Sequence, residues 1–430
     1  MEFIEILRRR PKGFENRPLK TPKLEANQLD SGTRVKVFAR HLWAATGFAA
    51  RGVFCFNCDT YETDKGETSM KFRALVLLAM LAMTFACAGP QTPQGSASQN
   101  GSNTSDPNRK LKIGFAMATV REERWQRDRV AFEAHCKELN VECVITVADN
   151  NSSRQANDVD NLLTQKVDVL VIAPQEATEA AAMVEKAKAQ GVPVISYDRL
   201  INSEKIDLYI SHQVPVIGRK IAEYALQKVP KGNYVMVYGS STDNNAHIMK
   251  KEQLAVLQPA IDRGDIKIVA DQMIPDWKND LALNFAENSL TKEGDNIQAF
   301  VVSNDGMAGG VISALAKKGL AGKVLVTGQD AGVEALQNIA EGKQSMTVYK
   351  PIIPLANQAV EAAIKLAKKE PLSTTPFAND RIGGKEIPAI LLEVTVVDKD
   401  NLMQTVIKDG YTTFEKVYQN VPEADRPKQQ

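Results

Sequence analysis

Alternation between short apolar runs and longer helix-forming segments dominates the chain from Lys110 onward. The apolar runs are nearly continuous, as is typical of parallel strands that are covered by helices on both faces. The first part contains strands predicted at 111–117, 142–149, 167–174, 192–198 and 207–211, separated by helices predicted at 121–139, 153–166 and 178–190. This order predicts an α/β fold built on a doubly wound parallel sheet.

The same pattern starts again in the second half of the chain. It comprises helices predicted at 216–228, 246–262, 277–290, 307–318 and 333–341 and strands predicted at 233–240, 266–272, 299–305, 323–330 and 345–350. A last helix is predicted at 353–368 and a last strand at 389–397, and the tail 411–430 is polar and expected to be peripheral. About 320 residues (430 minus 110) are more than one hydrophobic core usually holds, so we expect two α/β lobes of similar plan.

A stretch that begins at Met70 has the composition of a secretory signal peptide. Lys71 and Arg73 precede an apolar run that is too short to span a bilayer, and a small residue precedes Cys87. The closing TFAC resembles the cleavage box of bacterial lipoproteins, in which the cysteine becomes the lipidated first residue. It departs from that box at Thr84, where leucine is usual. The alternative interpretation is a short buried helix.

These features divide the N-terminal part of the chain into three segments. We predict that residues 1–69 are an upstream extension created by a mis-assigned start codon and that 70–87 is a lipoprotein signal peptide. Residues 88–109 are rich in Gly, Ser, Gln, Thr, Asn and Pro, which predicts a flexible tether. The signal peptide, Cys87 and the tether together predict a globular body that is held on a membrane surface.

Composition and short motifs argue against several classes of function. The net charge of +1 gives no basic excess that would favour a nucleic-acid partner. No nucleophile elbow, phosphate loop, zinc-ligand spacing or catalytic triad stands out, so we predict no enzyme activity, cofactor or metal. The lone CxxC at Cys55 and Cys58 is interpreted as incidental. Cys136 and Cys143 could form a disulfide after export, although their spacing does not establish the geometry.

Polar side chains follow the predicted strands at the carboxyl ends, where open α/β sheets bind ligands. Carboxylates accept hydrogen bonds from hydroxyl groups, Arg and Lys donate them and Asn does both, which suits a neutral polyol. Tryptophan rings can cover its C–H face. The predicted ligand-binding residues are Arg124, Trp125, Asp198, Arg199, Asp243, Asn245, Trp277, Asn304, Asp330 and Lys350. Each has a plainer explanation as well, since Asp and Asn often cap helices and Trp often packs in a core.

Several motifs, taken in order, resemble a known family. They are KIGFAMATVREERWQRD, VDVLVIAP, SYDRLIN, GSSTDNNA, VVSNDGMAGG, VTGQDA and SMTVYKP. In this order they resemble the periplasmic D-xylose-binding proteins of bacterial ABC transporters, within the ribose/galactose-type substrate-binding proteins, over about residues 110 to 410. The resemblance implies a type I periplasmic binding fold, in which two Rossmann-like lobes are joined by a three-stranded hinge and hold sugar in the cleft.

The resemblance also implies where the lobes and the binding residues lie. The first lobe would comprise about 110–212 and 350–375, and the second about 213–349 and 376–410. The eight polar residues named above would form hydrogen bonds with a pentose, and the two tryptophans would sandwich its ring. The sequence departs from the family at Ala118 and Thr119, where acidic residues are common, and at 211–214, in a hinge stretch that is usually more acidic.

From this resemblance we expect a protein that captures a monosaccharide, D-xylose in the first place, and delivers it to an ABC transporter permease. The protein would be a monomer in the periplasm or at the cell surface, held by a lipid anchor. Alternatives are a binding protein for another pentose or hexose, a sugar sensor that presents its ligand to a chemoreceptor or kinase, a cytoplasmic sugar-responsive repressor and an enzyme. The repressor would need a helix-turn-helix before residue 110, where the signal and tether stand.

Overall fold

A computed structural model describes residues 109–428 of the chain. The predicted upstream extension, signal peptide and lipidated Cys87 lie outside the described residues, as does nearly all of the tether. None of the helices within the described range combines the length and the apolar character needed to cross a membrane.

The first lobe is built on a seven-stranded sheet with the order β11-β12-β5-β4-β3-β1-β2. Its strands are β1 (Lys112–Met117), β2 (Glu142–Val147), β3 (Val169–Ala173), β4 (Val194–Tyr197), β5 (Leu208–His212), β11 (Thr375–Ala378) and β12 (Glu386–Leu392). All neighbouring pairs are parallel except β11 and β12. The predicted doubly wound sheet is therefore confirmed, with one antiparallel strand at its edge.

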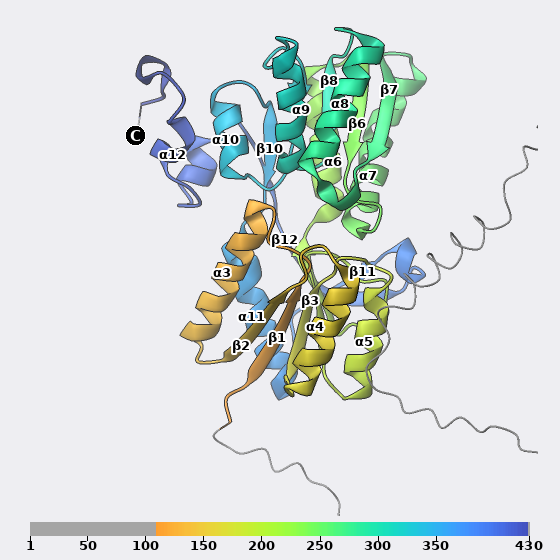
Figure 1. Cartoon of the computed structure of the whole chain (residues 1–430), viewed down its shortest axis with the longest axis vertical. Helices are drawn as coiled ribbons and strands as arrows, with labels where there is room; N and C mark the ends of the chain where they lie inside the picture. Colours follow the sequence, from red (N-terminus) through yellow and green to blue (C-terminus); the bar gives the residue numbers. More distant parts are fainter. Residues whose placement is uncertain (1–108, 429–430) are drawn as a thin grey trace, which may run out of the picture. The chain divides into compact units, whose positions relative to one another are not determined.

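Helices cover both faces of this sheet, as its apolar strands require. Helices α3 (Glu123–Glu138) and α11 (Ile352–Lys368) lie on one face, and α4 (Ser152–Thr164) and α5 (Ala180–Ala189) lie on the other (Figure 1). Strand β1 shows why: Phe115 packs with the α3 and α11 side chains, whereas its neighbour Ala116 packs with those of α4 and α5. Burying one phenylalanine ring contributes about 1.5–3 kcal/mol, so the face that carries Phe115 stabilises the lobe.

The second lobe repeats this plan around a four-stranded parallel sheet with the order β7-β6-β8-β9. Its strands are β6 (Gly232–Tyr238), β7 (Ile266–Met273), β8 (Ala299–Val302) and β9 (Leu325–Val326). The helices that pack on it are α6 (Val214–Lys228), α7 (Asn244–Asp262), α8 (Asn279–Glu293) and α9 (Asp305–Lys317). A separate antiparallel pair, β10 (Met346–Tyr349) with β13 (Thr395–Asp398), and helix α10 (Val333–Ala340) complete the lobe.

The chain passes between the lobes three times: after β5, after β10, and between β12 and β13. Two expectations were wrong here. The strand predicted at 389–397 divides into β12, which pairs with β5, and β13, which pairs with β10. Residues 376–392 therefore belong to the first lobe and not to the second. Both halves are similarly apolar, so only the two pairing partners reveal that the chain changes lobes between them.

The tail from residue 411 is also less peripheral than expected. Helix α12 (Phe414–Tyr418) buries Val417 and Tyr418 against α10 and β13 side chains. These apolar residues are sparse in a polar stretch, and this is why the composition alone predicted a peripheral tail. The C-terminal segment thus adds a small core to the second lobe.

A disulfide joins Cys136, at the end of α3, to Cys143 in β2, with their Cα atoms 6.2 Å apart. The sequence had left this pairing open.

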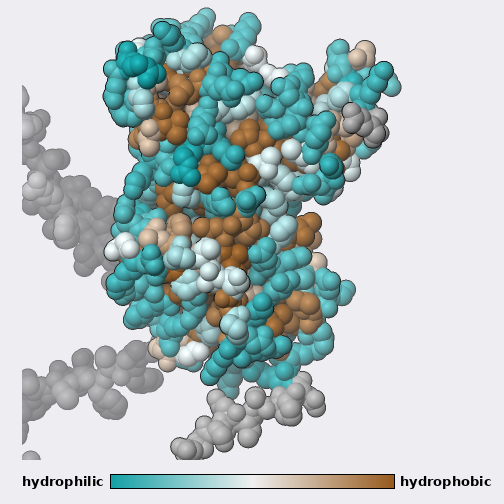
Figure 2. All heavy atoms as spheres, turned by 180° about the vertical axis from the view of Figure 1, so that it is seen from behind, coloured by the Kyte–Doolittle hydropathy of each residue, from teal (hydrophilic) through white to brown (hydrophobic). Residues whose placement is uncertain are grey.

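On the face that Figure 2 shows, hydrophilic side chains cover most of the surface and hydrophobic ones gather in patches between them. This agrees with a fold whose large apolar side chains are mostly inside the two lobes.

Candidate functional site

Two adjoining cavities lie where the carboxyl ends of both sheets face each other. The inner one, of about 30 Å³, is lined by all ten predicted residues together with Glu122 and Gln329. The outer one, of about 330 Å³, shares five lining residues with it, namely Glu122, Arg124, Trp277, Asn304 and Asp330. The structure thus brings together, from both lobes, every side chain that the sequence singled out. Their role towards a ligand remains a prediction.

Local structure explains how several of these side chains reach the cavity. Arg124 and Trp125 lie in the first turn of α3, directly after the loop that leaves β1. Asp243 caps α7 by accepting a hydrogen bond from the Asn245 amide at 2.9 Å. Asn304 caps α9 by accepting one from the Met307 amide at 3.0 Å. The cap and the ligand-binding interpretations are therefore compatible, because capping leaves these side chains at the cavity wall.

Three residues of the inner cavity have left-handed backbone conformations. The φ angles are 57° at Asp198, 57° at Trp277 and 103° at Asp330. Such angles are uncommon for residues other than glycine and persist only where the surroundings impose them, often at functional sites. At this site they turn one tryptophan and two carboxylates towards the cavity.

Charged groups in the inner cavity form a buried network that connects both lobes. Arg124 binds Asp128 at 3.0 Å and Asp198 at 2.7 Å, and Lys350 binds Asp330 at 2.8 Å. Arg124 also lies 3.8 Å from Asp330, which belongs to the second lobe. Burial by itself would raise the pKa of Asp198. The Arg124 guanidinium and the Lys350 ammonium group outweigh burial and hold this pKa well below its usual range. Asp198 is therefore ionised at neutral pH.

A second ion pair joins the lobes near Trp125. Arg199 of the first lobe lies 3.0 Å from Asp243 of the second. The guanidinium carbons of Arg124 and Arg199 lie 4.2 Å and 5.2 Å from the centre of the Trp125 ring. Cation–π contacts of this kind hold an aromatic ring in place. Trp125 thus lies beside the cavity with its plane held by two guanidinium groups.

Trp277 is placed by a close approach to a glycine. A Cβ atom at Gly239 would lie only 2.1 Å from the Trp277 ring, so only glycine leaves room for the ring there. The Trp277 indole nitrogen is buried and has no hydrogen-bond partner among the described residues. Trp277 therefore lines the inner cavity while its indole donor is left without a partner.

Sequence reasoning missed Glu122 and Gln329 as lining residues, and Asp128 as the buried partner of Arg124. Glu122 directly precedes the charged first turn of α3, which could have drawn attention to it. Asp128, however, lies one helical turn after Arg124, and nothing in its sequence context marks it as part of the site. The departures from the family at Ala118 and Thr119 line neither cavity.

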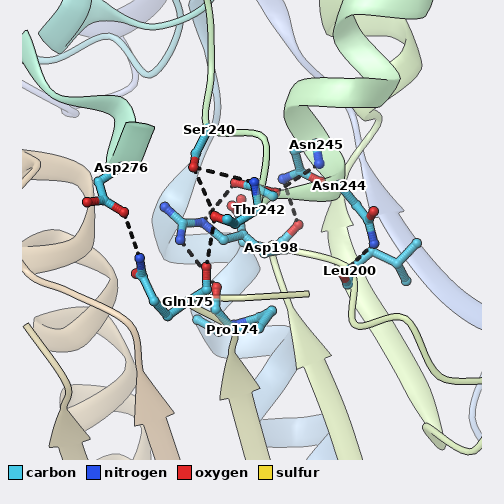
Figure 3. A network of polar contacts seen from close by, with 12 residues as sticks. Pro174, Gln175, Asp198, Leu200, Ser240, Thr242, Asn244, Asn245 and Asp276 are labelled. Atoms are coloured by element: carbon cyan, nitrogen blue, oxygen red, sulfur yellow. Dashed lines mark hydrogen bonds and ion pairs between the residues drawn. The ribbon is translucent and has the colours of Figure 1, made fainter. Parts of the chain in front are cut away.

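The two lobes also touch through hydrogen bonds of amide groups (Figure 3). The Gln175 amide nitrogen donates to Asp276 at 2.9 Å, and the Asn244 side chain donates to the Leu200 carbonyl at 2.8 Å. The Asn245 side chain donates to the Asp198 carbonyl at 3.0 Å. These bonds join the loops after β3 and β4 to the first turn of α7 and the loop after β7. The structure therefore shows the lobes in direct contact around the cavity.

His212 lies at the first crossing between the lobes and is fully buried. Its Nε2 atom lies 3.2 Å from the Pro351 carbonyl, at the second crossing. Burial and the nearby Lys350 ammonium group lower the pKa of His212 to about 3. The histidine therefore stays neutral in the folded protein over the range in which an unfolded chain binds a proton.

The low pKa of His212 predicts how the stability of the protein depends on pH. Because the folded-state pKa lies below the unfolded value of about 6.5, the free energy of unfolding should fall as the pH drops below 6.5. The His212 contribution is about 1.4 kcal/mol per pH unit, or about 2 kcal/mol at pH 5. His212→Gln keeps a donor for Pro351 but does not titrate, so urea unfolding at pH 7 and pH 5 should show a smaller loss in the variant. An equal loss in both proteins would contradict the prediction.

In the described residues 109–428, no group of three or more His, Cys, Asp or Glu side chains is arranged to hold a metal ion. The arrangement instead offers donors, acceptors and two rings around one small cavity.

A family model described as periplasmic binding protein domain matches residues 113–371. The D-xylose-binding periplasmic protein of Haemophilus influenzae is 40% identical over 74% of this chain and 95% of its own length. The protein of the same name from Escherichia coli is 42% identical over 70% of this chain and 91% of its own length. A solved carbohydrate transporter solute-binding protein from Chloroflexus aurantiacus, in complex with D-glucose, is 29% identical, with a TM-score of 0.67 over 72% of this chain and 98% of that one. These relatives are sugar-binding proteins and not enzymes, and the chain belongs to the periplasmic binding protein family.

Proposed function

We propose that this protein captures a monosaccharide, D-xylose in the first place, between its lobes and delivers it to the permease of an ABC transporter. The observation that carries the proposal is the inner cavity, in which both lobes contribute hydrogen-bonding groups. With Glu122 included, three cations face four carboxylates, so the wall is close to neutral. A neutral polyol that donates to carboxylates and accepts from Arg, Lys and Asn suits such a wall.

The relatives support the choice of sugar, because two of them at 40% and 42% identity are named D-xylose-binding periplasmic proteins. They also support a periplasmic location.

In the proposed mechanism the lobes open and close about the three crossings. A sugar that binds groups of both lobes has a higher affinity for the closed state and therefore shifts the population towards it. The permease then recognises the closed, sugar-bound form.

Calorimetric titration of the purified protein with xylose, ribose, arabinose, glucose and galactose tests the proposal. Tight one-to-one binding of xylose alone would support both the function and the sugar. Binding of another sugar would retain the function and change the substrate. Turnover of any of these sugars, or binding of none, would contradict the proposal.

Asp330→Asn is expected to weaken xylose binding by about 10–150-fold, because a hydrogen bond to a charged group contributes about 1.5–3 kcal/mol. The amide keeps the size of the side chain but loses the charge that Lys350 binds. Asp271→Asn, which removes an exposed carboxylate on β7, is the matched control and should leave affinity unchanged. Equal affinity for Asp330→Asn and the unaltered protein would exclude Asp330 as a ligand-binding residue.

We extend the proposal to the N-terminal part of the chain, where Cys87 would carry the lipid that anchors a monomeric binding protein to the membrane. Support comes from the composition of 70–87 and from the polar stretch 88–109 that follows. Labelling of a bacterial host with radioactive palmitate should mark the protein and not its Cys87→Ala variant. An unlabelled protein would contradict the proposed lipid anchor. A dimer mass measured by light scattering would contradict the proposed monomeric state.

A further inference from the structure

Two residues of α3 outside the inner cavity form a pair that reaches the other lobe. Glu123 and Arg127 are one helical turn apart, and their side chains form an ion pair at 2.6 Å. Neither residue lines the inner cavity, and Glu123 lines only the outer one. Ion pairs at this spacing are common on helix surfaces and usually contribute little by themselves. The further contacts of these two residues set them apart.

Each member of the pair binds a backbone group of the second lobe. The Glu123 Oε2 atom accepts a hydrogen bond from the Val333 amide at 2.8 Å, in the first turn of α10. The Arg127 Nη1 atom donates to the Tyr411 carbonyl at 2.8 Å, and its guanidinium carbon lies 4.3 Å from the centre of the Tyr411 ring. A carboxylate at a helix N-terminus and a cation on an aromatic face are both favourable arrangements.

The contacts of this pair lie next to the binding residues without including them. The Tyr411 hydroxyl donates to the Asp330 carbonyl at 3.2 Å, and Asp330 lines the inner cavity. Tyr411 therefore connects Arg127 of the first lobe with the backbone that holds the Asp330 carboxylate. The pair can thus influence how firmly the lobes are held together around the cavity, although its side chains lie outside the inner wall.

We propose that Glu123 and Arg127 act as a clasp that stabilises the closed state and so sets sugar affinity without contacting the sugar. This inference rests on the proposed sugar-binding function. Since the two contacts join different lobes, they exist only when the lobes are together. Their free energy is therefore gained on closure, whichever sugar is bound. Clasp formation raises the closed population, and the apparent affinity rises by the same factor for every sugar.

The same helix supplies a matched control. Arg129 and Glu133 have the same spacing and form an ion pair at 2.9 Å. Among the described residues they make no hydrogen bond or ion pair with the second lobe. Replacing them removes the same charges from α3 and leaves the clasp intact. Any effect that is specific to Glu123 and Arg127 therefore reports on the contacts between the lobes.

The test compares Glu123→Ala/Arg127→Met with Arg129→Met/Glu133→Ala in the full-length protein, using a panel of sugars. The clasp variant should bind xylose about tenfold more weakly, since two half-exposed contacts are lost, and mainly through faster dissociation. The affinity ratio between xylose and the weaker sugars should not change. The control variant should stay within twofold of the unaltered protein. Unchanged affinity in the clasp variant, or a changed ratio between sugars, would overturn the proposal.

Small-angle scattering of the sugar-free proteins separates this proposal from the proposed function. The clasp variant should have a larger radius of gyration than the unaltered and control proteins, because its closed state is less populated. This readout needs no sugar, so it remains informative even if the unaltered protein binds none of the panel. Arg127→Lys, which keeps the charge but loses the planar stacking on Tyr411, is a milder variant and should show a smaller change. Equal radii in all the proteins would contradict the clasp.

Discussion

Replacing Arg124 with methionine is expected to lower the free energy of unfolding by about 3–5 kcal/mol, the range for breaking a buried ion pair by removing one partner. Arg124 is 5% exposed and binds Asp128, which has no exposed surface, and Asp198. Burial already raises the pKa of Asp128, and the Arg124 charge opposes that shift. Without Arg124, the two carboxylates would remain buried with less compensation for their charge.

Urea unfolding at pH 7 measures this effect. Arg129→Met is the matched control, because it removes an arginine from the same helix that pairs only at the surface, and it should change stability by less than about 0.5 kcal/mol. Adding Asp128→Asn to Arg124→Met should restore part of the loss, since one buried charge is then removed. A loss below about 1 kcal/mol for Arg124→Met would mean that water compensates these carboxylates.

Gly239→Ala is expected to weaken xylose binding by about 5–150-fold, which corresponds to the cost of about 1–3 kcal/mol for overpacking a filled site. The added methyl group would lie 2.1 Å from the Trp277 ring, and the ring would have to move. Because Trp277 lines the inner cavity, its displacement changes the proposed stacking surface without removing any group that binds the sugar. Calorimetric titration gives the affinity, and tryptophan fluorescence reports the displacement of the ring.

Gly309→Ala is the control for this glycine. A Cβ atom at Gly309 would be 3.4 Å from the nearest atom, a carboxylate oxygen of Glu334, which is an ordinary contact. Within helix α9 the exchange should stabilise the protein by up to about 1 kcal/mol and leave affinity unchanged. Unaltered xylose affinity in Gly239→Ala would show that Trp277 does not stack on the sugar.

Much of the candidate site was predictable because strand ends are visible in the sequence. Asp198 and Asp330 each follow an apolar run, and a parallel sheet brings the carboxyl ends of its strands to one edge. The same reasoning could not find Asp128, which lies in the second turn of a helix and reaches the site only through Arg124. Nor could it separate Glu123 and Arg127 from Arg129 and Glu133, since both pairs have the same spacing.

The sequence by itself determined the two α/β lobes, because the period of the apolar residues depends only on local geometry. It also determined which polar groups stand at the strand ends. Only the tertiary structure decided that β12 joins the first sheet while β13 joins β10, because strand pairing depends on partners far away in the chain. The tertiary structure likewise decided which ion pairs link the lobes, since such contacts depend on how the two lobes meet and not on residue spacing.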